Sequence, residues 1–300
     1  MSRQLGDLRT LRTSALEIAY HESGPPEGPS AVLLHGFPYD PLCYEAVALA
    51  LSAQGMRTIV PYLRGYGPTR FLEAGTPRSG EQAALGNDLI ELIEALALSR
   101  PVVAGYDWGG RAACITAAVR PDLVRGLVSV GGYNLFGPPA TGPLAPEMEH
   151  ILWYQYYLQM HRGRMMLNDN RRGFCKLLWK LWSPVWDFTD ETFERSAKSF
   201  DNADFVEVVL HSYRHRAGLA PGDPKLAALA ARLELRPDIS VPTIVLHGDT
   251  DVTPLAMSLD RSRFSGPYAH RVLSRVGHNP PQEAPEPVID AILELAGSAT

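Results

Sequence analysis

Short apolar runs alternate with amphipathic stretches along the first half of the chain. Runs with the length and continuous apolar character of strands buried in a parallel sheet lie at residues 31–34, 57–60, 102–104 and 124–130. Between them, residues 43–54 and 79–96 carry apolar side chains at helical spacing. Residues 8–13 and 15–21 precede them and predict two strands of a hairpin. This alternation predicts an α/β fold with a mostly parallel sheet flanked by helices.

The pattern changes after Gly131. Residues 137–146 are rich in Pro and Gly, and from residue 147 to 232 helical spacing dominates in a segment dense in aromatic side chains. Strand and helix patterns then resume at residues 239–247, 254–263, 270–273 and 288–295. We therefore predict an α/β core formed by residues 1–134 and 239–300, interrupted by a helical cap at residues 135–238.

Composition restricts the class of protein. With 300 residues, 45% of them hydrophobic, the chain can form a large core. A net charge of −5 with interspersed signs does not favour a nucleic-acid partner, and no apolar run is long enough for a membrane span. The N-terminus lacks the apolar segment of a secretory signal, so a cytoplasmic location is expected. We expect a small-molecule substrate, and the oligomeric state, a homodimer included, stays open.

The three cysteines give no indication of a bound group. Cys43, Cys114 and Cys175 are far apart in the sequence and lack the spacing of metal ligands. Buried free thiols are the usual state of such cysteines in a cytoplasmic protein. We therefore expect no metal and no cofactor.

The central motif is Gly105-Tyr106-Asp107-Trp108-Gly109, between the strand at 102–104 and a helix that begins with small residues. Strand, glycine-flanked turn and helix are the setting of a nucleophile elbow, which holds one side chain in a strained position above the sheet. Ser is the usual residue at this point, but here it is Asp107. We predict that Asp107 is the nucleophile.

The loop His35-Gly36-Phe37-Pro38 follows another predicted strand, at the edge where active sites of open α/β sheets collect. Backbone N–H groups in such a turn can bind a developing oxyanion, and the N–H after the nucleophile supplies a second donor. The expected donors are the amides of Phe37 and Trp108. His35 is expected to hold the turn by hydrogen bonding rather than to act as a base.

Two later loops supply an acid and a base. Residues 247–251 contain Asp249 and Asp251, and Gly277-His278-Asn279 follows the strand at 270–273. The order Asp, Asp, His along the chain matches the order nucleophile, acid, base of the α/β-hydrolase triad. We therefore predict the α/β-hydrolase fold, with a sheet of the eight-stranded type.

Taken together, these motifs resemble α/β-hydrolases of the epoxide hydrolase and haloalkane dehalogenase branch. The matching motifs are H-G-F-P at 35–38, G-Y-D-W-G-G at 105–110, G-D-T-D at 248–251 and G-H-N-P-P-Q-E at 277–283. By position in the pattern, the resemblance implies that Asp251, rather than Asp249, is the acid that supports His278.

A carboxylate nucleophile indicates what kind of carbon is attacked. A Ser alkoxide attacking a saturated carbon would leave an ether, whereas a carboxylate leaves an ester that water can cleave. Asp, with a reference pKa of ~3.9, is already ionised at neutral pH, so His278 is free to activate water in the second step. Asp107 therefore favours an epoxide or a carbon–halogen bond as the substrate group.

The leaving group distinguishes these two substrates. An epoxide oxygen must be protonated, and epoxide hydrolases supply two tyrosines from the cap. The segment Trp153-Tyr154-Gln155-Tyr156 resembles the first of these motifs, and His211-Ser212-Tyr213-Arg214 resembles the second. The resemblance therefore implies that Tyr154 and Tyr213 hold the ring oxygen, and the expected activity is opening of an epoxide to a vicinal diol through an aspartyl ester.

A dehalogenase is the main competing function, since Trp108 occupies the place of a halide donor in haloalkane dehalogenases. Trp179, Trp182 and Trp186 of the cap are candidates for the substrate-binding wall, or for packing between cap and sheet. Arg111 is similar to an arginine that holds a substrate carboxylate in haloacid-type relatives, although the companion position is Trp108. Ester hydrolysis and non-catalytic ligand binding are two further functions compatible with the same fold.

Several further polar residues have simpler interpretations. His211 and His215 lie one helical turn apart without an evident carboxylate or Cys partner, which does not favour a metal site. Residues 214–216, Arg-His-Arg, are expected to form a solvated helix end. Arg64 and Arg70 are expected to be surface charges or to fix their loop.

Overall fold

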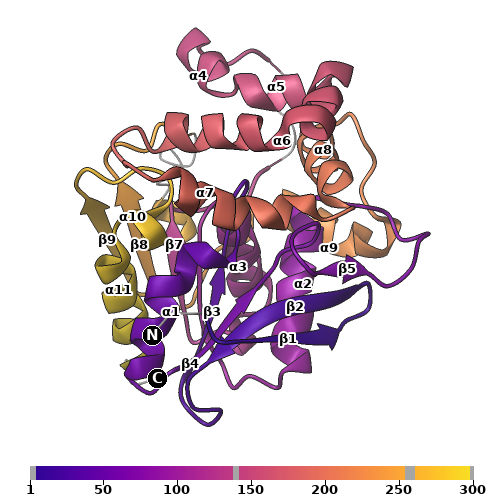
Figure 1. The fold of residues 1–300 in the computed structure, drawn as a ribbon. Helices are drawn as coiled ribbons and strands as arrows, with labels where there is room; N and C mark the ends of the chain where they lie inside the picture. The colour runs from indigo at the N-terminus through magenta and orange to yellow at the C-terminus, as the bar shows by residue number, and fades with distance from the viewer. Residues whose placement is uncertain (1–4, 138–141, 254–260, 298–300) are drawn as a thin grey trace.

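One sheet runs through the whole molecule (Figure 1). The computed structural model describes residues 5–137, 142–253 and 261–297. The strands of this part of the chain are β1 (Asp7–Arg12), β2 (Leu16–Ser23), β3 (Ser30–Leu34), β4 (Arg57–Pro61), β5 (Arg70–Phe71), β6 (Val102–Gly105), β7 (Gly126–Val130), β8 (Thr243–Gly248) and β9 (Tyr268–Leu273). Their order is β1-β2-β4-β3-β6-β7-β8-β9, with the short β5 paired to β2. From β4 to β9 all neighbours are parallel, so their carboxyl ends meet at one edge.

Helices cover both faces of this sheet. The core helices are α1 (Glu45–Ala53), α2 (Gln82–Ala95), α3 (Asp107–Val119), α10 (Pro280–Glu283) and α11 (Pro285–Gly297). Helix α1 packs beside α11, and α2 packs beside α3 on the opposite face (Figure 1). Gly86 of α2 lets α3 approach, since a Cβ there would lie 2.3 Å from Cγ2 of Ile115. The central strands β3, β6 and β7 are buried almost throughout, as expected for parallel strands covered on both sides.

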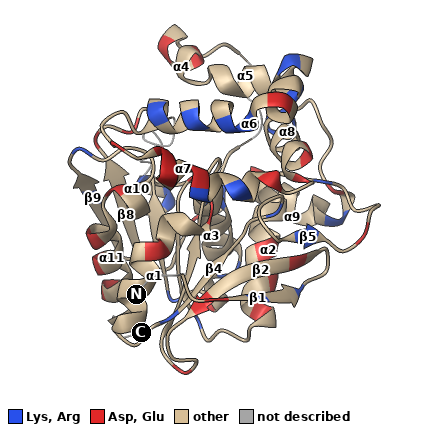
Figure 2. Ribbon diagram, in the orientation of Figure 1, with Lys and Arg blue, Asp and Glu red and all other residues tan. Residues whose placement is uncertain are grey.

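The segment between β7 and β8 is helical. It comprises α4 (Pro146–Ile151), α5 (Trp153–Gln159), α6 (His161–Trp182), α7 (Asp190–Ala197), α8 (Phe205–Arg216) and α9 (Ala227–Glu234). Helices α4 to α8 lie above the carboxyl edge of the sheet, while α9 lies beside α2 (Figure 1). Figure 2 shows basic residues along α6 and acidic ones on α7. Lys176 of α6 forms an ion pair of 2.8 Å with Asp190 of α7. Such exposed pairs stabilise a fold only slightly.

The cap helices are joined to the core loops mainly by buried contacts. The indole N–H of Trp179 in α6 donates to the carbonyl oxygen of Pro38 across 2.8 Å, and both tryptophan and loop are buried. Asn202, just before α8, donates to the carbonyl oxygens of Gly67 and Thr69 at 2.8 and 2.7 Å. These contacts hold α6 and the segment before α8 against the loops that follow β3 and β4.

The structure confirms the predicted α/β fold and most of its elements. The helix expected at 43–54 is divided into a 3-10 turn, Pro41–Tyr44, and α1. The strand expected from residue 239 begins at Thr243, because Pro242 has no N–H for the ladder and Ile239 forms only an isolated bridge. The short strand β5 is not among the elements that the sequence predicts. The helix expected near 254–263 falls largely outside the described residues.

None of the helices in the described ranges combines the length and the apolar character that a membrane span requires.

Candidate active site

Asp107 stands at the sharp turn from β6 into α3. Its backbone has φ +49°, a left-handed conformation that is strained for a residue with a side chain. The turn needs close approach of two loops, because a Cβ at Gly109 would lie 2.1 Å from the carbonyl oxygen of Leu34. Asp107 is 7% exposed and its carboxylate points into the space under the cap. The strained turn and the glycines beside it match the predicted nucleophile elbow.

The Phe37 loop holds this carboxylate from one side. The backbone N–H of Phe37 donates to Oδ1 of Asp107 at 2.8 Å. A Cβ at Gly36 would lie 2.5 Å from Cβ of Asp107, so only glycine permits this approach. Trp108 follows Asp107 in the chain, and the role of its amide as a second oxyanion donor stays a prediction.

His35 fixes the same loop. Its Nδ1–H donates to the carbonyl oxygen of Gly36 at 3.0 Å, and its Nε2 accepts the N–H of Leu63 at 3.1 Å. Burial lowers the pKa of His35 to about 4, so the ring is neutral at pH 7. The imidazole therefore acts as a hydrogen-bonding part of the turn, as the sequence indicated.

His278 lies between the two carboxylates predicted for the triad. Its Nδ1 lies 3.1 Å from Oδ2 of Asp251 and 3.2 Å from Oγ1 of Thr253. Its Nε2 lies 3.9 Å from Oδ2 of Asp107 and has no hydrogen-bond partner among the described residues. Asp249 lies apart and accepts the backbone N–H of Arg275 at 2.6 Å. The geometry therefore brings Asp107, His278 and Asp251 together and leaves out Asp249.

The charges around His278 set its protonation. Burial opposes the imidazolium, but the charge and hydrogen bond of Asp251, followed by the charges of Asp107 and Glu283, together raise the pKa of His278 above its ordinary value of 6.5. If Asp107 became a neutral ester, one of these charges would disappear and the pKa would fall.

The two predicted tyrosines face each other from the cap. Tyr154 of α5 and Tyr213 of α8 have ring centroids 5.6 Å apart and nearly perpendicular ring planes. Tyr154 lines a small cavity together with Asp107 and His278, and Tyr213 packs against Phe37 with centroids 5.7 Å apart. Tyr154 therefore reaches the cavity above the elbow, and Tyr213 packs beside it without being among the described residues that line this cavity.

Both tyrosines are neutral at pH 7. Burial, with the nearby charge of Asp107, raises the pKa of Tyr154 to about 12, although Gln155 donates a hydrogen bond to its hydroxyl at 3.0 Å. Burial, with the effects of Tyr154 and Asp107, raises the pKa of Tyr213 well above 10. Each phenol therefore keeps a proton that it can donate.

The tryptophans divide into two groups. Trp182, at the end of α6, lines the cavity beside Asp107, with its ring centroid 5.0 Å from that of His278. Trp179 stacks on Tyr39 at 4.6 Å and on Trp186 at 5.5 Å, between cap and core. Trp108 is fully buried and stacks on Phe37. Of the four predicted substrate-binding tryptophans, only Trp182 is among the described residues that line this cavity.

Two arginines complete the cavity, and sequence reasoning missed one of them. Arg111 lies one turn after Asp107 on α3, and Arg216 is the last residue of α8. The expectation that residues 214–216 form a solvated helix end is therefore wrong for Arg216. The physical reason is helical register, since Arg216 is three residues after Tyr213 and shares its face. That spacing was the signal available in the sequence.

The two histidines of α8 have protein partners. His211 accepts the N–H of Gly80 at 3.1 Å and binds the carbonyl oxygen of Pro221 at 2.9 Å. His215 lies 3.3 Å from Glu81. Over the described ranges, His, Cys, Asp and Glu do not gather in any group of three that could hold a metal.

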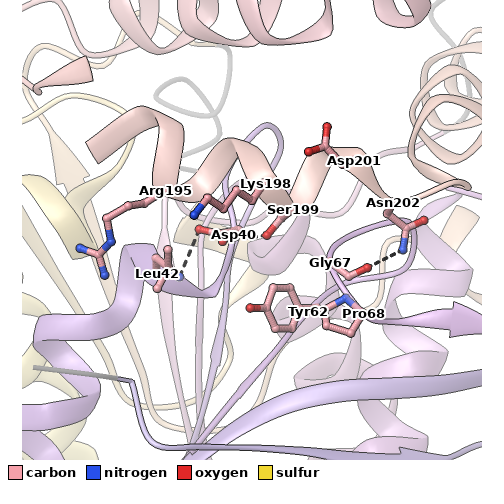
Figure 3. A pocket seen from close by; sticks show the side chains of 10 residues that line it. All are labelled: Asp40, Leu42, Tyr62, Gly67, Pro68, Arg195, Lys198, Ser199, Asp201 and Asn202. Atoms are coloured by element: carbon pink, nitrogen blue, oxygen red, sulfur yellow. Dashed lines mark hydrogen bonds between the residues drawn. The ribbon is translucent and has the colours of Figure 1, made fainter. Parts of the chain in front are cut away.

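A hollow of about 550 Å³ lies at the junction of cap and core, away from Asp107 (Figure 3). Asp40 at its base is 1% exposed and accepts hydrogen bonds from Ser199 at 2.8 Å and from the N–H of Leu42 at 3.2 Å. Burial raises the pKa of Asp40 to about 7, even though these hydrogen bonds and the charge of Arg195 act in the opposite direction. Asp40 thus joins the 3-10 turn of the core to the cap segment at Ser199.

Comparison with curated proteins gives relatives of two kinds. Epoxide hydrolase 2 of Siraitia grosvenorii is 31% identical over 131 residues, which are 44% of this chain and 40% of that enzyme. The chain therefore matches less than half the length of that relative. A haloalkane dehalogenase of Mycobacterium marinum is 26% identical over 261 residues, which are 85% of this chain and 79% of that one.

Solved structures extend the comparison. A "putative epoxide hydrolase" of Klebsiella pneumoniae is 42% identical, with a TM-score of 0.93 over 96% of this chain and 97% of that one. Epoxide hydrolase VrEH1 of Vigna radiata has a TM-score of 0.76 at 21% identity over 98% of each chain, a likeness of fold. The family described as "alpha/beta hydrolase fold" matches residues 29–280. The chain therefore belongs to the alpha/beta hydrolase fold family, in the branch of the epoxide hydrolases and haloalkane dehalogenases.

Proposed function

We propose that this protein opens an epoxide to a vicinal diol through a covalent ester on Asp107. The observation that carries the proposal is the placement of Asp107 at the elbow, below two neutral tyrosines and beside His278. The epoxide hydrolase names of its relatives support the same reaction. Residues 135–238 act in this proposal as a cap that closes the substrate cavity.

The first half-reaction uses Asp107 and the tyrosines. Phe37 holds Oδ1, so Oδ2 is the free oxygen that attacks one ring carbon. The carbon–oxygen bond of the ring breaks, and the departing oxygen takes a proton from the phenol of Tyr154 or Tyr213. The result is a hydroxyalkyl ester of Asp107 and a phenolate that is reprotonated later in the cycle.

The second half-reaction uses His278 and water. Nε2 takes a proton from water, and the hydroxide attacks the ester carbonyl of Asp107, while Asp251 stabilises the imidazolium. The tetrahedral oxyanion forms at the oxygen held by Phe37. When it collapses, the diol leaves with the proton from His278. The proton of the new Asp107 carboxyl group then returns to the tyrosine phenolate, which restores the Asp107 carboxylate. The net reaction consumes one epoxide and one water.

Dehalogenation is a second candidate, favoured by one observation. The indole N–H of Trp108, beside the nucleophile, is buried and has no hydrogen-bond partner among the described residues. Such a donor can stabilise a departing halide. Trp179 is not available for this role, because its indole N–H already donates to Pro38. The haloalkane dehalogenase relative supports this candidate.

The intermediate distinguishes the two candidates. In the His278→Gln variant the ester should accumulate, because alkylation proceeds and hydrolysis does not. Intact-protein mass after treatment with styrene oxide should increase by the whole epoxide, whereas a bromoalkane adds only its alkyl group. Asp107→Asn in the same background should stay unmodified. An unmodified His278→Gln protein whose parent forms diol would contradict the covalent mechanism.

A cytoplasmic location remains a proposal. It is supported by the state of Cys43, Cys114 and Cys175, which are buried free thiols in the structure.

A further inference from the structure

The loop that carries His278, residues 277–279, is held by two side chains from different parts of the fold. Glu283 of the core helix α10 accepts the N–H of Gly277 at 2.7 Å with Oε2 and the N–H of Asn279 at 2.8 Å with Oε1. The N–H between them, that of His278, donates to Oγ of Ser183 at 3.1 Å. Ser183 directly follows the cap helix α6. Three consecutive N–H groups of this base loop are therefore satisfied, the middle one by the cap.

The two side chains also bind each other. Oγ of Ser183 donates to Oε1 of Glu283 at 2.6 Å, and Ser183 is 1% exposed. A hydroxyl has a single proton, so Ser183 gives it to Glu283 and accepts the N–H of His278 with a lone pair. Each hydrogen bond thus requires the other residue to be in place. We call this pair the Ser183–Glu283 clamp.

The end of α6 touches the base loop directly. The carbonyl oxygen of Trp182 also accepts the N–H of His278, at 3.2 Å, and the two rings have centroids 5.0 Å apart. A Cβ at Gly277 would lie 2.5 Å from Cα of Ser183 and 2.8 Å from the carbonyl oxygen of Trp182. Only glycine at position 277 therefore permits this contact between the cap and the base loop.

The nucleophile is held in a different way. Asp107 is fixed by the elbow between β6 and α3 and by the N–H of Phe37, all of which belong to the core. Among the described residues, Asp107 receives no hydrogen bond from the cap. His278, in contrast, depends on the cap for the acceptors of its backbone N–H. The cap thus supports the base of the site but not the nucleophile.

From this arrangement we propose that Ser183 and Glu283 are positioning residues for His278, and that the contact of the cap with the base loop controls ester hydrolysis rather than ester formation. A catalytic side chain must be held within about 0.5 Å of its productive geometry by neighbours that do not react themselves. The inference rests on the proposed function for the order of the two half-reactions. The restraint of the base loop does not depend on turnover.

Glu283 also acts on His278 through its charge. Burial lowers the pKa of His278, whereas the charges of the two triad aspartates and, after them, of Glu283 raise it. The phenols of Tyr39 and Tyr106 face the imidazole as well, with ring centroids 6.3 and 5.9 Å from it. Burial raises the pKa of both phenols well above 10, so they are neutral. Ser183 carries no charge, so its effect on His278 is one of position alone.

A single turnover of styrene oxide, followed by rapid quench and intact-protein mass, measures ester formation and ester decay separately. In Ser183→Ala, formation should stay within about twofold of the parent, and decay should slow roughly 10- to 100-fold, because a displaced base reaches water poorly. Ser196→Ala is the matched control, since Ser196 is equally buried in the cap, on α7, but contacts Asp40. Parental ester decay in Ser183→Ala, or equal slowing of both steps, would overturn the proposal.

The pH dependence of ester decay separates position from charge. Glu283→Gln should slow decay, because an amide nitrogen cannot accept one of the two loop N–H groups. It should also move the rising limb to lower pH, since a charge that raises the pKa of His278 is lost. Ser183→Ala should lower the rate at every pH and leave the limb in place. Glu286→Gln, which removes the same charge from an exposed position on α11, is the control. A limb that moves in both clamp variants, or in neither, would contradict the proposal.

Hydrogen exchange tests the clamp without any substrate. In Ser183→Ala and in Glu283→Gln, the amides of residues 277–279 should exchange roughly 10-fold faster than in the parent, while those of β6 keep the parental rate. If exchange increases in this way but the parent hydrolyses no epoxide, the restraint of His278 stands and the proposed function fails. If epoxides are hydrolysed while exchange and ester decay in Ser183→Ala are parental, the clamp fails and the function stands.

Discussion

The backbone N–H of Phe37 donates a hydrogen bond of 2.8 Å to Oδ1 of Asp107. This contact joins the loop after β3 to the elbow after β6, two neighbouring parallel strands. Because one carboxylate oxygen is held in this way, the other is oriented toward His278 and Arg111, 3.9 Å from each. In the proposed mechanism, the same N–H faces the oxygen on which negative charge develops during ester hydrolysis.

Gly36→Ala should damage this contact. The added Cβ would lie 2.5 Å from Cβ of Asp107 and 3.1 Å from the carbonyl oxygen of Tyr106, so the Phe37 loop must shift. Loss of one oxyanion donor typically lowers kcat by about 10²- to 10³-fold, and we expect that range in steady-state assays. Gly75→Ala is the control, because a Cβ there meets no atom within 4 Å. A Gly36→Ala enzyme with the parental kcat would show that the contact is dispensable.

Asp251→Asn should change both the rate and its pH dependence. Asp251 is the main group that raises the pKa of His278, so the variant should have a lower pKa there. Since neutral His278 is the base, the rate rises with pH through this pKa, and the rising limb should move to lower pH. We also expect kcat to fall roughly 10⁴-fold, because the tautomer is no longer fixed. A pH–rate profile of ester hydrolysis measures both effects.

Asp249→Asn is the matched control for this variant. Asp249 follows the same strand but accepts the N–H of Arg275 instead of contacting His278. It should keep the parental pH profile. If the two variants behaved alike, the assignment of Asp251 to the triad would be wrong.

Removing the two phenols should affect epoxides selectively. Tyr154→Phe or Tyr213→Phe alone should slow ring opening by about 10- to 100-fold, and the double variant should abolish it, because general acid catalysis is lost. Alkylation by a bromoalkane should be almost unchanged, since bromide leaves without a proton. Rapid-quench measurement of ester formation on Asp107 compares the two substrates.

Tyr156→Phe serves as the control for the tyrosine variants, because Tyr156 is on α5 but exposed, with its hydroxyl bound to Glu149. Full epoxide opening by the double variant would remove Tyr154 and Tyr213 from the mechanism.

The elbow residue Asp107 and the base His278 were predictable because short motifs after strands report local backbone geometry. Asp107 needs small residues on both sides, and that requirement is visible as Gly105 and Gly109. Their catalytic roles remain predictions that the experiments above test. The fold class was equally accessible, since buried strands and amphipathic helices alternate along the chain.

Features that depend on how cap and core meet were not accessible in the same way. The charge of Arg216 predicted a position in contact with solvent. Arg216 lines the cavity because it is on the same face of α8 as Tyr213. The spacing of Trp179, Trp182 and Trp186 predicted a helix but not which ring lines a pocket, because that depends on where α6 lies over His278. Strand β5 spans only Arg70–Phe71, which is too short to show a periodic pattern.

Asp40 provides the last prediction, on stability rather than activity. Its carboxyl is buried at the cap–core junction, and burial raises its pKa from 3.8 to about 7 (Figure 3). Between these two values the folded protein keeps a proton that the unfolded chain releases. The contribution of Asp40 to the free energy of unfolding is therefore fully present below pH 3.8, and it is lost as the pH rises toward 7. The total loss is on the order of a few kcal/mol.

Asp40→Asn removes this titration. Its side-chain oxygen can still accept the N–H of Leu42, and its amide nitrogen can donate to the hydroxyl of Ser199, which in the parent donates to the second carboxyl oxygen. Relative to the parent, the variant should therefore gain stability between pH 5 and pH 8, measured as the difference in the free energy of urea unfolding. Taking the difference cancels the titration of all other groups. Asp201→Asn is the control at the same hollow, because Asp201 is exposed and pairs with Arg172, so its loss should cost less than about 1 kcal/mol at either pH. If the difference in the free energy of unfolding between Asp40→Asn and the parent did not change with pH, Asp40 would be ionised in the folded protein throughout this range. The hydrogen bond from Ser199 would then be to a carboxylate.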